Sequence, residues 1–300
     1  MYQVILNADD LGFSSSVNRA ILLATSNGTL TAASLMVNMP FAEEAVKAIH
    51  ESCADLSLGL HFCLTSGRSV AGAGQVPLLV NSNSCFRHGF LGIWRLLCSQ
   101  WKKEVLEQIR IEFLTQLERM DLFASRYSLQ FDHLDSHQHI HVFPDVFDMM
   151  EGEAQKRNLV LRIPRERLGP SKRVLYRFFT WFPSGLLKKG ILDYHLRKRV
   201  QAVGYYGILD TGKMDQRALH SIFETLVPGK TYEINIHPSE ELPVQGFRSE
   251  DSSAGDIEFH RSPWRQREYA ALLDPELKTM IERKRIQLVG FRQYRNETNE

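Results

Sequence analysis

The stretch Phe131-Asp132-His133-Leu134-Asp135-Ser136-His137-Gln138-His139-Ile140-His141 holds four of the chain's 11 histidines within nine residues. Side chains of an extended strand alternate between its two faces, so this spacing predicts a strand with Asp135 and all four histidines on one face. Burying imidazole and carboxylate groups costs free energy unless a metal or a charged partner satisfies them. We therefore interpret the stretch as a metal site at a strand end. The alternative is a solvated, histidine-rich loop.

A second signal lies at the N-terminus, where the apolar run 2–6 leads into Asn7-Ala8-Asp9-Asp10-Leu11-Gly12. The run predicts a buried strand, and Gly12 with the serines at 14–16 predicts a turn and a helix start. Adjacent carboxylates at the end of such a strand can point to opposite sides, so that one binds a cation while its neighbour accepts a proton. The alternative is that Asp10 is a turn residue and that one serine only caps the helix.

A third signal is the predicted strand Leu56-Ser57-Leu58-Gly59-Leu60-His61-Phe62, with a single histidine near its end. Such a histidine, taken alone, is more often structural than a metal ligand. Taken together, the three signals favour a metal site over three structural residues. Each lies at or near the end of a separate strand, and helices are predicted between them. One carboxylate and two histidines leave coordination positions open for water and substrate, which is typical of a catalytic metal site.

In these motifs the chain resembles the YdjC-like carbohydrate deacetylases, a family that includes chitooligosaccharide and hopanoid-associated deacetylases. The segments 27–38 and Ile236-His237-Pro238 also follow the family pattern, and the resemblance covers most of the chain. It implies an α/β fold, a distorted (β/α) TIM-like barrel as in polysaccharide deacetylases. The implied activity is hydrolysis of the N-acetyl group of an amino sugar to acetate and a free amine. The implied substrate is a chitooligosaccharide or a lipid-linked N-acetylglucosamine.

The resemblance also implies which residues bind the metal. Asp10, His61 and His137 match the family's ligands for one divalent ion. His139 and His141 match the family pattern but receive no metal role. Zinc and magnesium are both candidates, because two histidines and one carboxylate suit several ions.

Four further residues are expected around the metal. Asp9 matches the family's catalytic base, and His237 is similar to a C-terminal histidine that could serve as general acid. Asp135 can orient a ligand histidine from behind. Arg162 ends the next predicted strand and can pair with Asp9 to keep it ionised. A surface or structural ion pair is an equal alternative for Arg162.

Length, composition and patterning agree with this fold. A chain of 300 residues with 43% hydrophobic residues can form one barrel domain, here expected over 1–300. A net charge of +1 argues against a nucleic-acid partner, and the four cysteines show no disulfide or zinc-finger spacing. No signal peptide or membrane span is recognised, so a cytoplasmic enzyme is expected. Strands are predicted near 2–7, 32–38, 56–62, 129–135, 158–163, 203–208, 231–236 and 286–290, with helices near 15–27, 41–51, 102–124, 144–156, 215–227, 263–273 and 275–284.

Two long insertions, 67–90 and 167–200, are expected to shape the substrate pocket. The second follows no family pattern, and between 171 and 199 it interleaves basic residues with large aromatic ones. A core-packed helical pair with a solvated basic edge is the favoured interpretation. The alternative is a peripheral contact with anionic membrane, at the inner membrane face, that presents a lipid-linked substrate. A homodimer is also left open.

Two other classes of function stay open. One is a metal-dependent hydrolase of the phosphoesterase or amidohydrolase type, which often uses two ions and would take His139 and His141 as spare ligands. The other is a non-catalytic metal-binding protein. Asp9 argues against that class, because a storage or structural site has no use for a carboxylate beside the metal that does not bind it.

Overall fold

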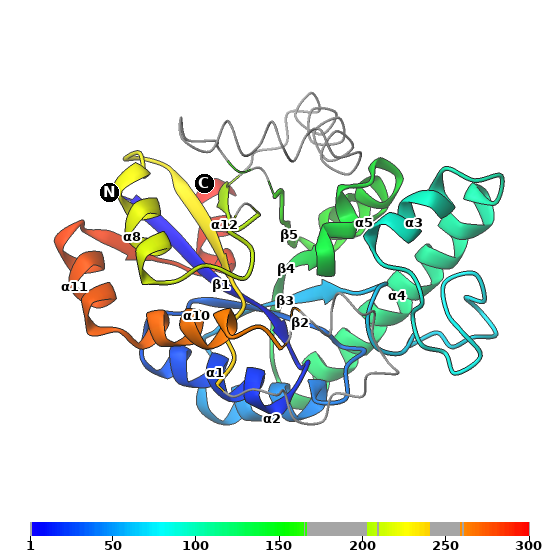
Figure 1. Ribbon diagram of the computed structural model, residues 1–300, viewed down its shortest axis with the longest axis horizontal. Coiled ribbons are helices and arrows are strands. Elements are labelled where there is room, and N and C mark those ends of the chain that lie inside the picture. Colours follow the sequence, from blue (N-terminus) through cyan, green and yellow to red (C-terminus); the bar gives the residue numbers. More distant parts are fainter. Residues whose placement is uncertain are drawn as a thin grey trace.

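A computed structural model describes residues 2–164, 166, 203–208, 210–240, 259 and 261–299. It is built around a parallel sheet with helices packed on the outside (Figure 1). This is the predicted α/β, TIM-like architecture, and each predicted strand is present. The strands are β1 (Tyr2–Leu11), β2 (Ala32–Leu35), β3 (Ser57–Phe62), β4 (Phe131–Ser136), β5 (Val160–Leu161), β6 (Gly204–Tyr206), β7 (Thr231–Ile236) and β8 (Ile286–Leu288).

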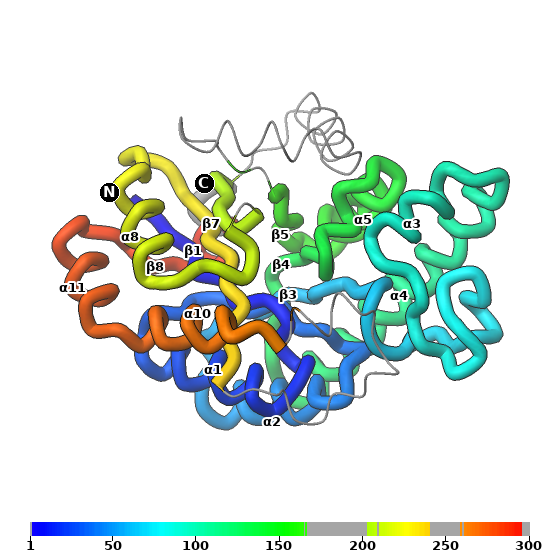
Figure 2. The backbone as a smooth tube through the Cα atoms, in the orientation of Figure 1, coloured from blue at the N-terminus to red at the C-terminus, as the bar shows by residue number. Residues whose placement is uncertain are grey.

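The strand β1 lies at the centre of the sheet, whose order is β5-β4-β3-β2-β1-β7-β6. Along one edge β1 pairs with β7; along the other it pairs first with β8 and then with β2, as the path of the chain in Figure 2 illustrates. A parallel bridge between Glu166 and Tyr205 joins the two outer ends. The sheet therefore curls into a distorted, half-open barrel, and the carboxyl ends of its strands meet at one end.

The helices follow the predicted alternation with the strands, and Figure 1 shows α4 and α5 beside β3 and β4. Two of them, α3 and α12, have no counterpart among the predicted helices. The sequence of α12 is mostly polar, so no apolar period marks it, and the fully buried Phe291 anchors it. The helices are α1 (Ser15–Ser26), α2 (Ala42–Ser52), α3 (Phe90–Leu97), α4 (Lys102–Tyr127), α5 (Pro144–Arg157), α8 (Gln216–Thr225), α10 (Trp264–Leu273), α11 (Pro275–Arg283) and α12 (Phe291–Asn299).

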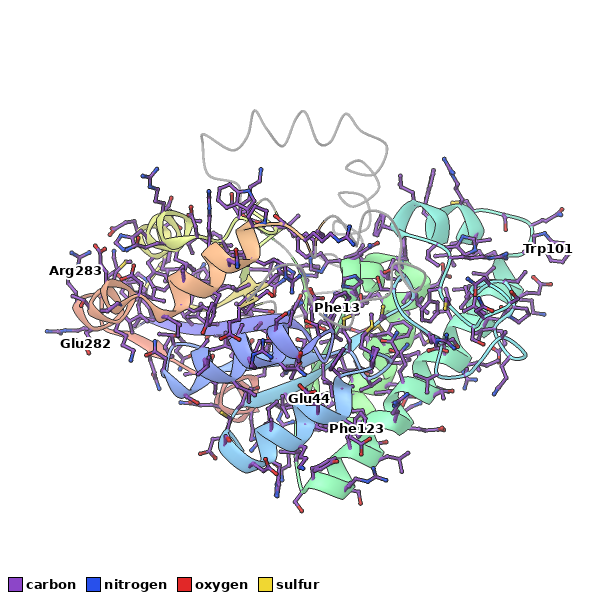
Figure 3. All side chains as sticks on the ribbon, turned by 60° about the horizontal axis from the view of Figure 1, so that its bottom comes forward. Phe13, Glu44, Trp101, Phe123, Glu282 and Arg283 are labelled. Carbon is purple, nitrogen blue, oxygen red and sulfur yellow. The ribbon has the colours of Figure 1, made fainter. Side chains whose placement is uncertain are left out.

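The main apolar core lies between the sheet and these helices. The helix α4 shows how the sequence builds it, because one face repeats apolar residues at every third or fourth position and that face is buried. A smaller cluster joins Phe13, Met36, Met39 and Cys63. Figure 3 shows Phe13 near the middle of the molecule and Trp101, which is 53% exposed, at its outer edge.

The first predicted insertion, 67–90, is tied back to the barrel. Two antiparallel bridges fold it onto itself, and Glu112 of α4 accepts hydrogen bonds from Ser69 and from the backbone of Val70 and Ala71. The second insertion, 167–200, lies outside the described residues, and so does its basic and aromatic part at 171–199. Within the described part of the chain, no helix has the length and apolar character needed to cross a membrane.

The histidine-rich stretch is only partly a strand. β4 ends at Ser136, and a 3₁₀ helix, η1 (His137–Val142), follows, in which Gln138 and His139 have φ angles of 54°. The predicted shared strand face is therefore wrong beyond Asp135. The physical reason is pairing. The last partner that β3 offers is Phe62, opposite Ser136, and among the described residues no further strand supports an extended backbone there.

The ring of His133 lies directly against Gly59, its neighbour on β3. A Cβ atom at Gly59 would lie 2.2 Å from that ring, which is far inside van der Waals contact. This glycine is therefore required by close packing and not by its backbone angles.

We predict that Gly59→Ala lowers the free energy of unfolding by about 1–3 kcal/mol, the usual cost of overpacking a core. Urea denaturation followed by circular dichroism measures this change. Gly74→Ala is the matched control, because a Cβ at Gly74 meets nothing within 4 Å. Equal stability of the two variants would contradict the packing of His133 on Gly59.

Candidate metal centre

Three of the predicted site residues meet at the carboxyl ends of their strands. Asp10 comes from β1, His61 from β3, and His137 directly follows β4. The Asp10 Oδ1 atom lies 3.6 Å from His61 Nε2 and 3.2 Å from His137 Nδ1, and all three side chains are buried. Metal–ligand bonds near 2.1 Å place neighbouring donors about 3.0–3.4 Å apart. One carboxylate and two imidazoles at these distances form a group that fits a single divalent ion.

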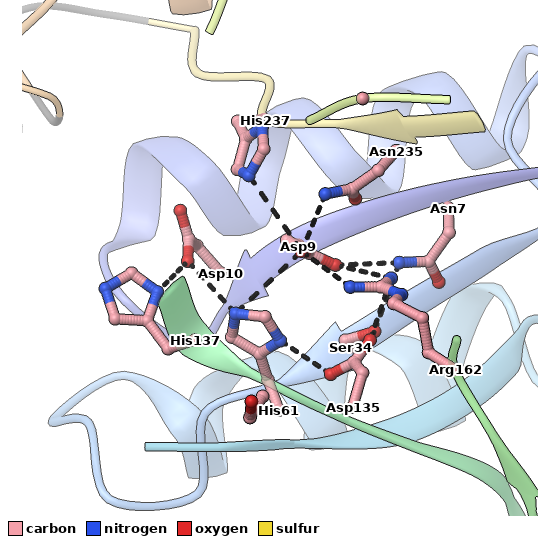
Figure 4. A network of polar contacts seen from close by, with 12 residues as sticks. Asn7, Asp9, Asp10, Ser34, His61, Asp135, His137, Arg162, Asn235 and His237 are labelled. Carbon is pink, nitrogen blue, oxygen red and sulfur yellow. Dashed lines mark hydrogen bonds and ion pairs between the residues drawn. The ribbon is translucent and has the colours of Figure 1, made fainter. Parts of the chain in front are cut away.

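A local irregularity of β1 brings both of its aspartates to this place. The pairing of β1 with β2 shifts between Ala8 and Leu11, and Asp10 has a φ of 67°. Aspartate tolerates this left-handed conformation better than most residues. Asp9 Oδ2 and Asp10 Oδ1 consequently lie 3.9 and 3.6 Å from His61 Nε2. In Figure 4, Asp10 lies towards His137, and Asp9 towards Arg162.

The carboxylate of Asp9 is held by four hydrogen-bond donors. Arg162 donates from Nη1 and Nη2 to its two oxygens, each at 2.9 Å. The amides of Asn7 and Asn235 donate to the same two oxygens at 2.8 Å. A carboxylate offers about four lone-pair positions, so Asp9 is saturated in this state.

Arg162 is a buried charge rather than a surface residue. Besides Asp9, its guanidinium contacts Asp135 Oδ2 at 2.8 Å and Glu233 Oε1 at 2.6 Å. These carboxylates come from β1, β4 and β7, so one side chain links three strands that are distant in sequence. The predicted pair between Arg162 and Asp9 is therefore present in the structure.

The electrostatics of these acids follow from Arg162. Burial alone would raise the pKa of Asp9, but Arg162, together with His61 and His237, outweighs burial and holds that pKa well below its usual range. Asp135 has a lowered pKa by the same balance, with His61 adding to the effect of Arg162. Burial raises the pKa of Glu233 to about 7, and Arg162 offsets only part of this shift. Asp9 and Asp135 are consequently fixed anions, whereas Glu233 can be protonated near neutral pH.

Asp135 contacts the ring nitrogen of His61 that faces away from Asp10. Its Oδ1 atom lies 2.6 Å from His61 Nδ1, and Ser34 donates a hydrogen bond to its Oδ2 at 2.6 Å. A histidine that gives its Nδ1 proton to a carboxylate presents a bare Nε2 to a metal. His133, on the same face of β4, contacts Asp132 and Ser34 with its two ring nitrogens and so lies behind the site.

A second group of possible ligands, formed by Asp9, His61 and Asp135, shares His61 with the first. Here the guanidinium of Arg162 already binds both carboxylates, and His61 Nδ1 already faces Asp135. A cation is thus in place, and a metal ion would have to displace it. The group of Asp10, His61 and His137 is the better candidate.

His141 has a structural role. Its Nε2 atom lies 3.1 Å from the carbonyl oxygen of Arg162, and its Nδ1 lies 2.6 Å from Ser136 Oγ. Burial lowers the pKa of His141 to about 3, so the neutral ring donates to Arg162 and accepts from Ser136. His139 meets the rings of His141 and Tyr205 edge to face. Neither histidine belongs to a metal-binding group of the described residues, which removes the spare ligands of the two-metal alternative.

His237 directly follows β7 and faces the same centre. Its Nε2 atom lies 3.9 Å from Asp9 Oδ2, and its backbone N–H donates to Glu268 Oε2 at 2.6 Å. The ring of Phe259 meets it edge to face. Burial lowers the pKa of His237 to about 4, so this imidazole is neutral near neutral pH.

Several residues of the site were missed by the sequence analysis. Two of them are Glu233 and Asn235 of β7. They occupy alternate positions that lead to the predicted His237, and this polar period of two was a usable signal for a strand lining the site. Arg265, which donates to Asp10 Oδ2 at 2.8 Å, lies 255 residues away in the chain. No local pattern marks such a contact.

Comparison with known proteins identifies the family of this chain. The family model described as YdjC-like protein matches residues 3–283. A carbohydrate deacetylase of Geobacillus stearothermophilus is 31% identical over 97% of both chains. A chitooligosaccharide deacetylase of Serratia marcescens is 34% identical over 54% of this chain and 60% of its own length. A crystal structure from Enterococcus faecalis, of a candidate cellobiose-phosphate cleavage protein, covers 98% of both chains with a TM-score of 0.69 at 22% identity, and shows the fold alone. The chain belongs to the YdjC-like protein family.

Proposed function

We propose that this protein is a metal-dependent deacetylase that hydrolyses the N-acetyl group of an amino sugar, and that residues 1–300 act as one catalytic domain. One observation supports this most. Asp10, His61 and His137 can hold one divalent ion, while Asp9 lies beside them and is bound by Arg162 instead. A carboxylate next to the ion but outside its ligands is what a hydrolase needs to accept a proton. The names of the relatives support an N-acetylated carbohydrate as the substrate.

The proposed chemistry divides among the residues of this centre. A divalent ion bound here supplies a water of lowered pKa and a polarised amide carbonyl. Asp9 accepts a proton from the attacking water, and His237 delivers a proton to the nitrogen as the carbon–nitrogen bond breaks. The water oxygen leaves in acetate, and the sugar leaves as a free amine. Asp135 keeps His61 in the orientation that ligation requires.

Two features of the resting site constrain these roles. Asp9 can accept a proton only when one of its four donors releases it, because its lone pairs are saturated. His237 is neutral before the reaction, so it acts as an acid only after it gains a proton within the cycle. Asp9 Oδ2 and His237 Nε2 are 3.9 Å apart, close enough for a small movement or one water to pass a proton between them.

The metal ligands are tested by removing them singly. We predict that His61→Ala and His137→Ala each lose most of the bound metal and the activity, while circular dichroism reports an unchanged fold. Metal content is measured by mass spectrometry of the purified protein. His139→Ala, in the same turn as His137, is the control and keeps its metal. If the His137→Ala variant kept its full metal content, the metal would be bound by other histidines and the assignment of His137 would be wrong.

The two aspartates are expected to fail differently. We predict that Asp9→Asn keeps the metal but slows the reaction by about 10²–10⁴-fold, the usual contribution of a positioned proton acceptor. Asp10→Asn should instead weaken metal binding. Metal content and kcat, measured on the same preparations, separate the two cases. If Asp9→Asn lost the metal and Asp10→Asn lost only rate, Asp9 would be the metal ligand and Asp10 the proton acceptor.

The activity itself is tested by acetate release from a panel of N-acetylated sugars, using protein reconstituted in turn with zinc and magnesium. The panel includes soluble chitobiose and a lipid-linked N-acetylglucosamine, the two substrates that the sequence left open. We expect metal-dependent acetate release from at least one of them. Phosphate release from sugar phosphates, with no acetate from any acetylated sugar, would favour the phosphoesterase class. Neither the membrane contact nor the homodimer is part of this proposal.

A further inference from the structure

Only one guanidinium nitrogen of Arg265, the second buried arginine of the site, donates a hydrogen bond to a described residue. It belongs to α10, has no exposed surface, and donates from Nη1 to Asp10 Oδ2 at 2.8 Å. Its Nε and Nη2 atoms are both buried and have no hydrogen-bond partner among the described residues. Arg162 gives the contrast, because all three of its guanidinium nitrogens bind carboxylates.

The unused atoms form a matched pair. The Nε–H and Nη2–H bonds of arginine leave the same side of the planar guanidinium and together fit the two oxygens of one carboxylate. Burying two such donors without a partner costs free energy, so the arrangement calls for an acceptor that binds there. Glu268, the acid of α10, accepts hydrogen bonds from the backbone N–H groups of Met214 and His237 and none from Arg265 Nε or Nη2.

The surroundings limit what such an acceptor can be. The ring of Phe259 lies against the guanidinium at 5.2 Å and also meets the ring of His237. Because this ring lies over the face of the guanidinium, it does not occupy the plane in which the two-donor fork binds a carboxylate. Complete burial of Arg265 favours a small anion over a bulky one such as a sugar phosphate. The contact with Asp10 places the fork one side chain away from the proposed metal.

We infer that the Nε and Nη2 atoms of Arg265 form a binding site for a small carboxylate, which under the proposed function is the acetate released from the sugar. In acetate, the former amide carbon carries two oxygens, one from the amide and one from the attacking water, and the fork can bind both. The site therefore predicts product inhibition by acetate. The identification of acetate rests on the proposed function; the carboxylate site itself does not.

Direct binding of ¹³C-labelled acetate, followed by NMR titration of the metal-loaded protein, tests the inference without relying on turnover. Arg265→Lys keeps a positive charge within reach of Asp10 but has no fork, so acetate binding should weaken by about tenfold or more. Arg267→Lys is the matched control, because Arg267 lies on the same helix with its side chain over Trp264, and its acetate binding should equal that of the wild type. Metal content of each variant is measured in parallel.

A crystal structure of the unaltered protein soaked in acetate provides a second test that needs no variant. We expect the acetate oxygens within hydrogen-bond distance of Arg265 Nε and Nη2. Acetate that is absent from the fork, or that binds equally well to Arg265→Lys with its metal retained, would overturn the inference. Deacetylation in the absence of acetate binding at the fork would defeat this inference alone, whereas acetate at the fork without any deacetylation would defeat the proposed function alone.

Discussion

The site depends on the contact between the buried guanidinium of Arg162 and three carboxylates. Asp9, Asp135 and Glu233 reach it from three different strands, and each is itself buried. Without the guanidinium, Asp9 and Asp135 would be uncompensated charges in a medium of low dielectric constant, and breaking such a buried pair costs about 3–5 kcal/mol. Arg162 therefore stabilises the barrel end and, under the proposed function, keeps Asp9 and Asp135 from binding the metal.

The adjacent carboxylates of Asp9 and Asp10 each pair with a different arginine. Neighbouring anions raise each other's pKa, so a paired cation is needed for each to stay ionised. Arg162 binds Asp9, and Arg265 binds the Oδ2 atom of Asp10. The Oδ1 atom of Asp10 is then left facing His61 and His137. Under the proposed function, one dipeptide thus supplies both a metal ligand and a separate proton acceptor, each carboxylate having its own arginine.

Much of this centre could be predicted from the sequence because it is built from short motifs at strand ends. Parallel strands bring those ends together whatever the helices between them, so Asp10, His61 and Asp135 could be placed before the structure was known. The turn after Ser136 could not, because the alternating pattern of histidines continues past the last strand partner. Neither could the left-handed backbone of Asp10 nor the contact from Arg265, since both depend on packing between distant segments. The predicted roles of Asp9, His237 and the three ligands stay predictions until a metal is located.

The location of the bound ion tests the account most directly. Crystals of the protein loaded with zinc, measured at the zinc absorption edge, would show the ion as an anomalous peak. The account predicts one peak between Asp10, His61 and His137, with both oxygens of Asp9 still bound to Arg162. A peak between Asp9, His61 and Asp135, with Arg162 displaced, would contradict it.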